Sequence, residues 1–280
     1  MLGRPQYVRV NESDSSVILT STGAPQGCVS SPILFILYTN DCICEEDHCM
    51  IEKFADDTVL AGFLTGPDSE VAYDKAIQDL ISWCDNNYLH LNTSKTKELI
   101  IDFRRQQTLK QPKRIKLQSI EQVHEYKYLG TIIDDNLSWN SNTDHIYKKS
   151  QQRLHFLRCL RQFNVDTTLM TLFYQTFIFP ILCFNLLSWF GNLTVQNRNK
   201  LFKITNVSSK IAGTQLDSLS TFYTRQMIKK ANKIIKDTSH TLHSEYENLR
   251  SGKRLRSIAS KTNRTLNSFV PKSIRILNAK

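Results

Sequence analysis

Two adjacent carboxylates, Asp56 and Asp57, stand inside a segment that otherwise favours β structure. The segment Met50–Phe63 is rich in apolar residues on both sides of this pair. Successive side chains on a strand point to opposite faces, so two neighbouring carboxylates converge on one site only where the chain turns. The segment therefore predicts a tight hairpin with the acidic pair at its tip.

Two interpretations of the acidic pair follow from the residues alone. Asp-Asp is common in hairpin turns, where the short side chains bond to nearby backbone groups. Adjacent carboxylates also suit a hard cation such as Mg²⁺ and can bridge two ions for in-line phosphoryl transfer. Charge and spacing leave both interpretations open.

The charge of the chain is unevenly placed along its 280 residues. Residues 1–100 hold 6 basic and 15 acidic residues, a net charge of −9, whereas residues 101–280 hold 30 and 11, a net charge of +19. An acidic first part suits bound cations, and a basic second part suits a polyanionic partner.

The segments around the acidic pair predict an alternation of strands and helices. Residues 6–20 predict a hairpin that turns at Asn11–Asp14. A glycine-containing loop, residues 23–27, precedes a helix for which Ser31 is the expected N-cap and Pro32 the first helical residue. A second helix begins near Ser69, because its apolar residues share one helical face. These residues are Tyr73, Ile77, Leu80, Ile81 and Cys84. Strands are expected over Glu98–Phe103 and Tyr126–Ile133.

After about residue 140 the pattern becomes helical. In Lys148–Phe163 one face is expected to pack, formed by Phe156, Leu157, Leu160 and Phe163. The uncharged stretch Leu169–Gly191 is long enough for a membrane span. Polar residues and a proline interrupt it, however, so we expect a buried helical pair and no membrane partner.

Glycine and cysteine patterns argue against several functions. The nine glycines include no Gly-x-Gly, no phosphate loop and no Gly-x-Ser-x-Gly. The seven cysteines form an irregular set and no signal peptide is evident, so we expect a reduced intracellular compartment, the nucleus or cytoplasm. The spacing of Cys42, Cys44, His48 and Cys49 suits a zinc tetrahedron poorly and favours coincidental thiols.

Four motifs follow one another along the chain and carry a resemblance. They are Gly23-Ala-Pro-Gln-Gly27 with the run to Phe35, Phe54-Ala-Asp-Asp57, Leu91-Asn-Thr-Ser-Lys95-Thr-Lys97 and Tyr128-Leu-Gly130. Their order and approximate spacing resemble the later motifs of reverse transcriptases. Over almost its full length the chain resembles the non-LTR, LINE-like retrotransposon class. One such motif alone is weak evidence for the resemblance, whereas four motifs in series are strong evidence.

The resemblance implies roles for the motif residues. Asp56 would ligate catalytic Mg²⁺, or Mn²⁺ in its place, with Asp57 beside it. The loop of Pro25, Gln26 and Gly27 would hold the template base and incoming nucleotide, where a glycine lets the backbone approach closely.

The two remaining motifs imply a general acid and a primer contact. Lys95 would lie near the pyrophosphate leaving group and act as a general acid; a solvated loop lysine is the alternative. Tyr128, Leu129 and Gly130 resemble the primer-grip hairpin.

The fold class expected is α+β. The resemblance implies an incomplete right-hand polymerase palm, with an antiparallel sheet and helices, over residues 1–138. A mainly helical thumb-like region would follow over 139–224 and a basic C-terminal tail, weakly specified in structure, over 225–280. The implied partners are an RNA template, an RNA–DNA or DNA duplex bound through charge and shape, and dNTP.

One departure from the family concerns the metal ligands. Such polymerases have a further metal-binding Asp upstream of the Pro-Gln-Gly motif, but only Glu12 and Asp14 precede it here. We therefore expect the fingers, the first catalytic Asp, the neighbouring sugar-selecting residue and an upstream endonuclease domain to be absent. With an incomplete Mg²⁺ ligand set, this chain alone is expected to show no appreciable polymerase activity.

Other interpretations remain. The chain could be a retroelement remnant that binds nucleic acid without chemistry, or a decayed fragment with no selected role. Lys148–Phe184 also resembles a helical segment from the N-terminal region of an AlkB-type tRNA-modifying enzyme. That chemistry needs a His-x-carboxylate pair and a distal His for Fe(II), and no His follows His243-Ser-Glu245.

Overall fold

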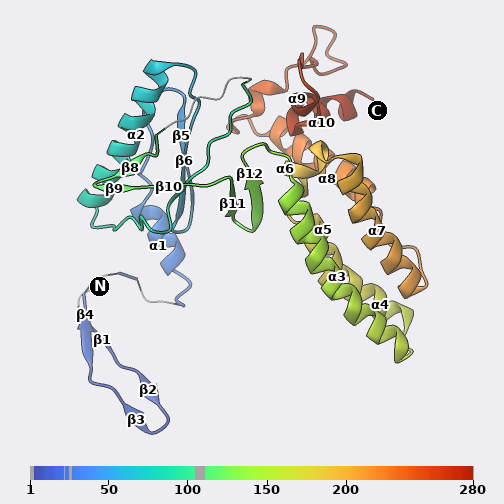
Figure 1. Cartoon of the computed structure of the whole chain (residues 1–280), viewed down its shortest axis with the longest axis horizontal. Coiled ribbons are helices and arrows are strands. Elements are labelled where there is room, and N and C mark those ends of the chain that lie inside the picture. Colours follow the sequence, from blue (N-terminus) through green and yellow to red (C-terminus); the bar gives the residue numbers. More distant parts are fainter. Residues whose placement is uncertain (1–2, 22, 25–26, 105–110, 280) are drawn as a thin grey trace. The chain divides into compact units, whose positions relative to one another are not determined.

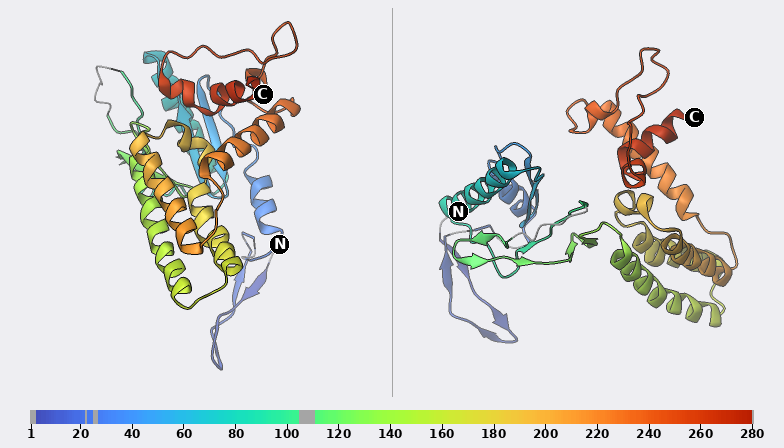
Figure 2. Two further views of the ribbon diagram at one scale, coloured as in Figure 1. Left: turned by 90° about the vertical axis from the view of Figure 1, so that its right-hand side faces the viewer. Right: turned by 45° about the horizontal axis from the view of Figure 1, so that its top comes forward.

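The computed structural model describes residues 3–21, 23–24, 27–104 and 111–279. The chain divides into two compact units. The first unit is Met1–Glu98 together with Lys110–Glu121, and the second unit is Leu99–Leu109 together with Gln122–Lys280. The first unit combines helices with short strands, and the second is mainly helical (Figure 1). Figure 2 gives two further views. The predicted mixed α+β class is confirmed, with strands in small two-stranded sheets.

The N-terminal segment forms the predicted hairpin. Strand β1 (Arg4–Gln6) pairs with β4 (Ile18–Thr20), and β2 (Arg9–Val10) pairs with β3 (Ser13–Asp14), both antiparallel. The chain reverses at Asn11, whose φ of 56° is one that asparagine tolerates. The predicted hairpin is therefore confirmed.

Helix α1 (Ser31–Tyr38) begins where a helix was predicted, but the expected N-cap was wrong by one residue. Ser30 is the N-cap, and Ser31 is already helical. The reason is local: the Ser31 N–H donates to the Cys28 carbonyl at 3.2 Å, so the backbone is turning before Ser31. Pro32 lies in the first turn, where it costs no hydrogen bond.

The acidic pair lies on a hairpin covered by a long helix. Strands β5 (Cys49–Phe54) and β6 (Asp57–Gly62) pair antiparallel, and helix α2 (Pro67–Asn86) follows them. The ring of Tyr73 packs over Gly62, where a Cβ atom would lie 2.5 Å from the ring. Three residues of the predicted face of α2 are buried, Ile77, Ile81 and Cys84, and its other two residues are half-buried, so this face is confirmed.

The connection between the two units contains less strand than expected. Only Lys97–Glu98 forms strand β7, so the strand predicted over Glu98–Phe103 was wrong in extent. A strand needs a neighbour for its backbone groups, and a continuous apolar run does not reveal whether one exists. Three other short strands complete this region: β8 (Arg114–Ile115), β9 (Gln118–Ser119) and β10 (Glu121–Gln122).

The second unit begins with a hairpin that packs on its first helix. Strands β11 (Glu125–Tyr128) and β12 (Thr131–Asp134) pair antiparallel. The Ile132 N–H donates to the Asn142 side-chain oxygen at 3.2 Å in helix α3 (Asn140–Gln162). The hairpin thus belongs to the same compact unit as the helices that follow it.

The packing face of α3 was only partly predicted. Leu157 is fully buried, but Phe156 is 49% exposed and Phe163 is 81% exposed. The buried face continues through Leu154, Ser150 and other residues nearer the helix start. This face packs along helix α7 (Val195–Ala212). The buried face of α3 includes small polar residues, which a pattern of large apolar side chains does not predict.

The apolar stretch Leu169–Gly191 forms a bent helical series whose inner face is buried, as predicted. Its elements are α4 (Thr167–Phe173), the π-helix η1 (Tyr174–Ile178), α5 (Phe179–Cys183), α6 (Leu186–Trp189) and the 3₁₀-helix η2 (Phe190–Asn192). Met170, Tyr174 and Trp189 are almost completely buried. Among the described residues no single helix meets the length and apolarity needed for a membrane span, and one pair bent by 42° meets them jointly.

The C-terminal residues are packed rather than weakly structured. Helix α8 (Leu219–Lys236) runs across the expected boundary at residues 224–225. After it come η3 (His243–Glu245), α9 (Asn263–Asn267) and α10 (Phe269–Asn278). These elements share a hydrophobic cluster with α8, formed by Ala231, Ile234, Tyr246, Leu255 and Ile274.

Candidate active site

The tip of the β5–β6 hairpin presents both carboxylates to solvent. Phe54 pairs with Asp57, so Ala55 and Asp56 form a two-residue turn. Asp56 lies in the turn and Asp57 is the first residue of β6, and both are exposed. Ala55 has a φ of 53°, a left-handed conformation that costs an alanine about 1 kcal/mol. The predicted hairpin with the acidic pair at its tip is confirmed.

Lys53 fixes the position of this hairpin in the first unit. Its ammonium group donates to the Cys42 carbonyl at 2.8 Å and to the Thr39 carbonyl. Both carbonyls lie just after α1, so the lysine ties the strand beside the acidic pair to the end of that helix. Its side chain is on the less exposed face of β5, where exposed and half-buried residues alternate.

Replacing Lys53 with methionine keeps most of the aliphatic chain but removes this tie. We expect the free energy of unfolding to fall by about 1–3 kcal/mol, because two carbonyls lose a charged donor. Urea denaturation measures the change. Lys95→Met, at an exposed loop position, is the control and is expected to change stability by less than about 0.5 kcal/mol. Equal losses in the two variants would contradict the role of Lys53.

The acidic pair supplies hard oxygen donors but not a complete metal site. Carboxylates are the side chains that Mg²⁺ prefers. Within the described parts of the chain, no three His, Cys, Asp or Glu side chains gather in a way that would hold a metal ion. The carboxylates are therefore suitable ligands for Mg²⁺, but two of them are too few to complete its coordination.

Lys95 lies in a compact loop organised by Asn92. The Lys95 N–H donates to the Asn92 side-chain oxygen at 3.2 Å, and the Thr96 hydroxyl donates to the Asn92 carbonyl at 2.9 Å. The Lys95 side chain is exposed and, among the described residues, forms no ion pair. Its loop is thus a defined turn that presents a free ammonium group.

The expected nucleotide-binding loop is described only at its end. Pro25 and Gln26 lie outside the described residues. Gly27 has a φ of 76°, in the left-handed region that favours glycine, and no atom lies within 4 Å of the position its Cβ would take. This glycine leaves its surroundings open.

Cys28, beside that loop, is expected to be the most reactive thiol. It is exposed, and its sulfur lies 3.0 Å from the Ser30 hydroxyl, which lowers the pKa of the thiol. Burial raises the pKa of Cys183 to about 12. At pH 7.5 more of Cys28 is thiolate, the form that reacts. Mass spectrometry after brief iodoacetamide treatment should show Cys28 modified before Cys183. Ser30→Ala should slow the Cys28 reaction, and an unchanged rate would contradict this assignment.

The turn of the β11–β12 hairpin contains the fourth predicted motif. Leu129 and Gly130 are the two turn residues, with φ values of 44° and 87°. Such turns need positive φ at both central positions, which favours glycine. A Cβ at Gly130 would also lie 3.1 Å from the Phe184 ring. Tyr128, Leu129 and Gly130 thus form a tight turn against the helical unit.

The predicted site residues divide between the two compact units. Gly27, Asp56, Asp57 and Lys95 belong to the first unit, and Tyr128–Gly130 belongs to the second. The structure brings the two carboxylates together at one turn. It gives no contact among the described residues that joins them to Lys95.

Comparison with known families decides the class of the first part of the chain. Residues 2–133 match the family described as reverse transcriptase (RNA-dependent DNA polymerase). This segment is a reverse transcriptase domain. The reverse transcriptase prediction is therefore confirmed for these residues, which contain the Gly27 loop, the acidic hairpin, the Lys95 loop and the β11–β12 turn.

A curated relative extends the similarity beyond the domain. "Probable RNA-directed DNA polymerase from transposon BS" of Drosophila melanogaster is 25% identical over 210 residues, which cover 71% of this chain. The match covers 23% of the relative, so the chain spans about a quarter of that protein's length. No solved structure matches the chain.

A second family match falls on the helical unit. Residues 139–178 match the family described as alkylated DNA repair protein alkB homolog 8, N-terminal. These residues include α3, α4 and η1. The His243 ring nitrogen lies 3.2 Å from the Ile234 carbonyl, outside the matched region. The match thus concerns helices, and the His243-Ser-Glu245 segment lies outside it.

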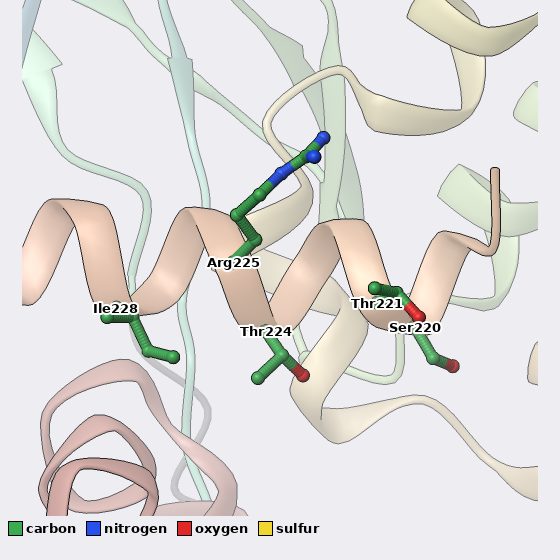
Figure 3. A pocket seen from close by; sticks show the side chains of 5 residues that line it. All are labelled: Ser220, Thr221, Thr224, Arg225 and Ile228. Atoms are coloured by element: carbon green, nitrogen blue, oxygen red, sulfur yellow. The ribbon is translucent and has the colours of Figure 1, made fainter.

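Two open surface depressions lie in the second unit. Five side chains of α8 line one of them: Ser220, Thr221, Thr224, Arg225 and Ile228. In Figure 3 the Arg225 side chain leaves the helix in a different direction from Thr224 and Ile228. The other is lined by residues between Phe202 and Ser220. The α8 depression contains no carboxylate and has no features of a metal site.

Lys53 is the functional neighbour that the sequence analysis missed. The sequence did contain a signal for it, because a lysine at an inward-facing position of a strand needs a polar partner. The identity of that partner, a pair of backbone carbonyls, depends on tertiary structure.

Proposed function

We propose that this chain is part of an RNA-directed DNA polymerase of a non-LTR retrotransposon, with Asp56 and Asp57 as two of its Mg²⁺ ligands. The observation that carries the proposal is the acidic pair at the tip of a two-residue turn, inside a reverse transcriptase domain. Pro25, Gln26 and Gly27 would contact template and nucleotide, Lys95 the leaving group, and Tyr128–Gly130 the primer strand. Residues 1–138 then correspond to the palm, and the helical residues from 139 onward correspond to the thumb and a basic C-terminal region that shares α8 with it.

Each chemical role follows from what this chain's own residues offer. Two exposed carboxylates on a hairpin held by Lys53 are preorganised for a hard cation. Bound Mg²⁺ would neutralise charge at the transferred phosphate. The exposed Lys95 ammonium can donate a proton or stabilise a leaving phosphate, and Gly27 leaves room for close approach of a ligand to backbone.

The donor set also supports a second part of the proposal, that this chain alone does not extend primers. A two-metal site requires more donors than two carboxylates, and the described residues bring no third ligand to the tip. The chain would instead bind an RNA–DNA or DNA duplex without chemistry, in keeping with the net charge of +19 over residues 101–280.

Primer extension on a primed RNA template, with Mg²⁺ or Mn²⁺, tests the chemistry. We expect no dNTP incorporation above that of Asp56→Ala. Robust incorporation that disappears in Asp56→Ala would show that the two carboxylates suffice, and would overturn the predicted inactivity while supporting the polymerase role.

Protection of Cys28 tests the binding role separately. A primed RNA template bound at the Gly27 loop should reduce iodoacetamide modification of Cys28 about tenfold or more, because the loop becomes covered. Cys159, which is half-buried in α3, provides an internal reference within the same sample. If the duplex binds and Cys28 reacts as fast as before, the assigned template position is wrong.

A further inference from the structure

A group of basic and aromatic side chains meets where α7, α8 and α10 come together in the second unit. Arg198 comes from α7, Tyr223 from α8, and Lys272 and Arg275 from α10. The Arg198 guanidinium lies 5.4 Å from the centre of the Phe190 ring. The Lys272 ammonium lies 5.0 Å from the centre of the Tyr223 ring.

The two aromatic rings hold these cations on one scaffold. The Phe190 and Tyr223 ring centres are 4.8 Å apart. Both rings are almost fully buried, with exposed fractions of 3% each. Arg198 and Lys272 are themselves half-buried. The positive groups are therefore fixed by packing rather than free in solvent.

Two polar atoms in this group lack a hydrogen-bond partner within the described residues. They are the Tyr223 hydroxyl and the Arg198 Nε, and both are buried. Gly191 borders the hydroxyl, since a Cβ at this glycine would lie 2.9 Å from it. Burying a donor without a partner costs about 1–3 kcal/mol, so such atoms call for an explanation.

The group has positive charge without a matching acid. Helices α7, α8 and α10 contain no Asp or Glu. Among the described residues, neither Arg198 nor Lys272 forms an ion pair. Burial lowers the pKa of Lys272, and the charges of Arg198 and Arg275 lower it further. A bound anion would relieve both the repulsion and the desolvation.

We propose that Arg198, Tyr223 and Lys272 form a binding site for one phosphate group, with Arg275 adding charge nearby. A guanidinium, an ammonium and a hydroxyl all donate hydrogen bonds, which is the donor set that phosphate oxygens accept. Burial raises the pKa of Tyr223 to about 12, so its hydroxyl stays a donor at neutral pH. The site goes beyond the proposed function and does not depend on it.

Isothermal titration of the 280-residue chain tests the site with two probes, inorganic phosphate and a short single-stranded DNA. Lys272→Gln should weaken binding about tenfold or more, since a charged hydrogen bond is lost. Lys203→Gln removes an exposed charge from α7. This control should weaken binding by less than about twofold. Weakening of both probes by Lys272→Gln indicates a free phosphate site, and weakening of DNA alone indicates a backbone phosphate.

Tyr223→Phe separates a ligand site from a packing role. It should weaken binding about threefold or more, because a hydrogen bond to the phosphate is lost. Its thermal unfolding temperature without ligand should stay unchanged or rise, because the hydroxyl has no partner to lose. The proposal is overturned if Lys272→Gln and Lys203→Gln bind both probes equally, or if Tyr223→Phe lowers stability and leaves affinity unchanged.

Discussion

We expect replacement of Gly191 with alanine to destabilise the second unit by about 3 kcal/mol, the upper end of the range for overpacking. The new Cβ would lie 2.3 Å from the carbonyl oxygen of Asn267 and 2.9 Å from the Tyr223 hydroxyl. The nearer atom is backbone, so it cannot move aside by changing a rotamer. Urea denaturation, followed by fluorescence of the adjacent buried Trp189, measures the loss.

Gly66→Ala is the matched control for this experiment. No atom lies within 4 Å of the Cβ position at Gly66, and its extended φ of −178° suits any residue. We expect a loss of no more than about 1 kcal/mol, because Gly66 is the N-cap of α2, where glycine is preferred over alanine. If Gly191→Ala is as stable as Gly66→Ala, then η2 and the C-terminal helices pack less closely than the structure indicates.

Local features of the chain were predictable because their causes are local. The acidic hairpin follows from apolar runs on both sides of Asp56 and Asp57, and the structure places the turn between Phe54 and Asp57. The buried face of α2 follows from the spacing of Ile77, Ile81 and Cys84. In each case a few neighbouring residues determine the outcome.

Features that depend on distant partners were not predictable. Periodicity in α3 pointed to Phe163, which is exposed, because the buried face is set by contact with α7 and includes small polar residues. The run at Glu98–Phe103 has strand character, but only Glu98 lies in a strand. The C-terminal residues form a cluster with α8 through Ile274 and Tyr246, far apart in the chain.

The candidate site shows the same division. The sequence motifs located the carboxylates, Lys95 and the Tyr128–Gly130 turn, and the structure describes a turn at each of these places. The sequence could not indicate that Lys53 would anchor the hairpin to carbonyls after α1. Nor could it indicate that Arg198 and Lys272 would lie in one group, because these contacts join separate elements.

Duplex affinity should depend steeply on salt. If the second unit contacts about five phosphates of an RNA–DNA duplex, raising salt from 50 to 200 mM should weaken binding about 500-fold, because bound counterions are released. Fluorescence anisotropy with a labelled duplex measures the slope of log affinity against log salt. A slope near zero would contradict duplex binding through backbone phosphates.

We expect the exposed lysines of α8 to make some of those contacts. Lys229 and Lys230 are exposed on a helix without acidic residues. Replacing both with glutamine should reduce the slope by about 1.8 if each contacts a phosphate. The control replaces Lys75 and Lys116 in the first unit, exposed lysines that pair with Glu46 and Asp85. Both double variants lose two positive charges, so they change the net charge of the chain equally. A phosphate contact is lost only where the replaced lysine touched the duplex. Equal salt slopes in the two double variants would therefore mean that net charge, and not the surface of α8, governs binding.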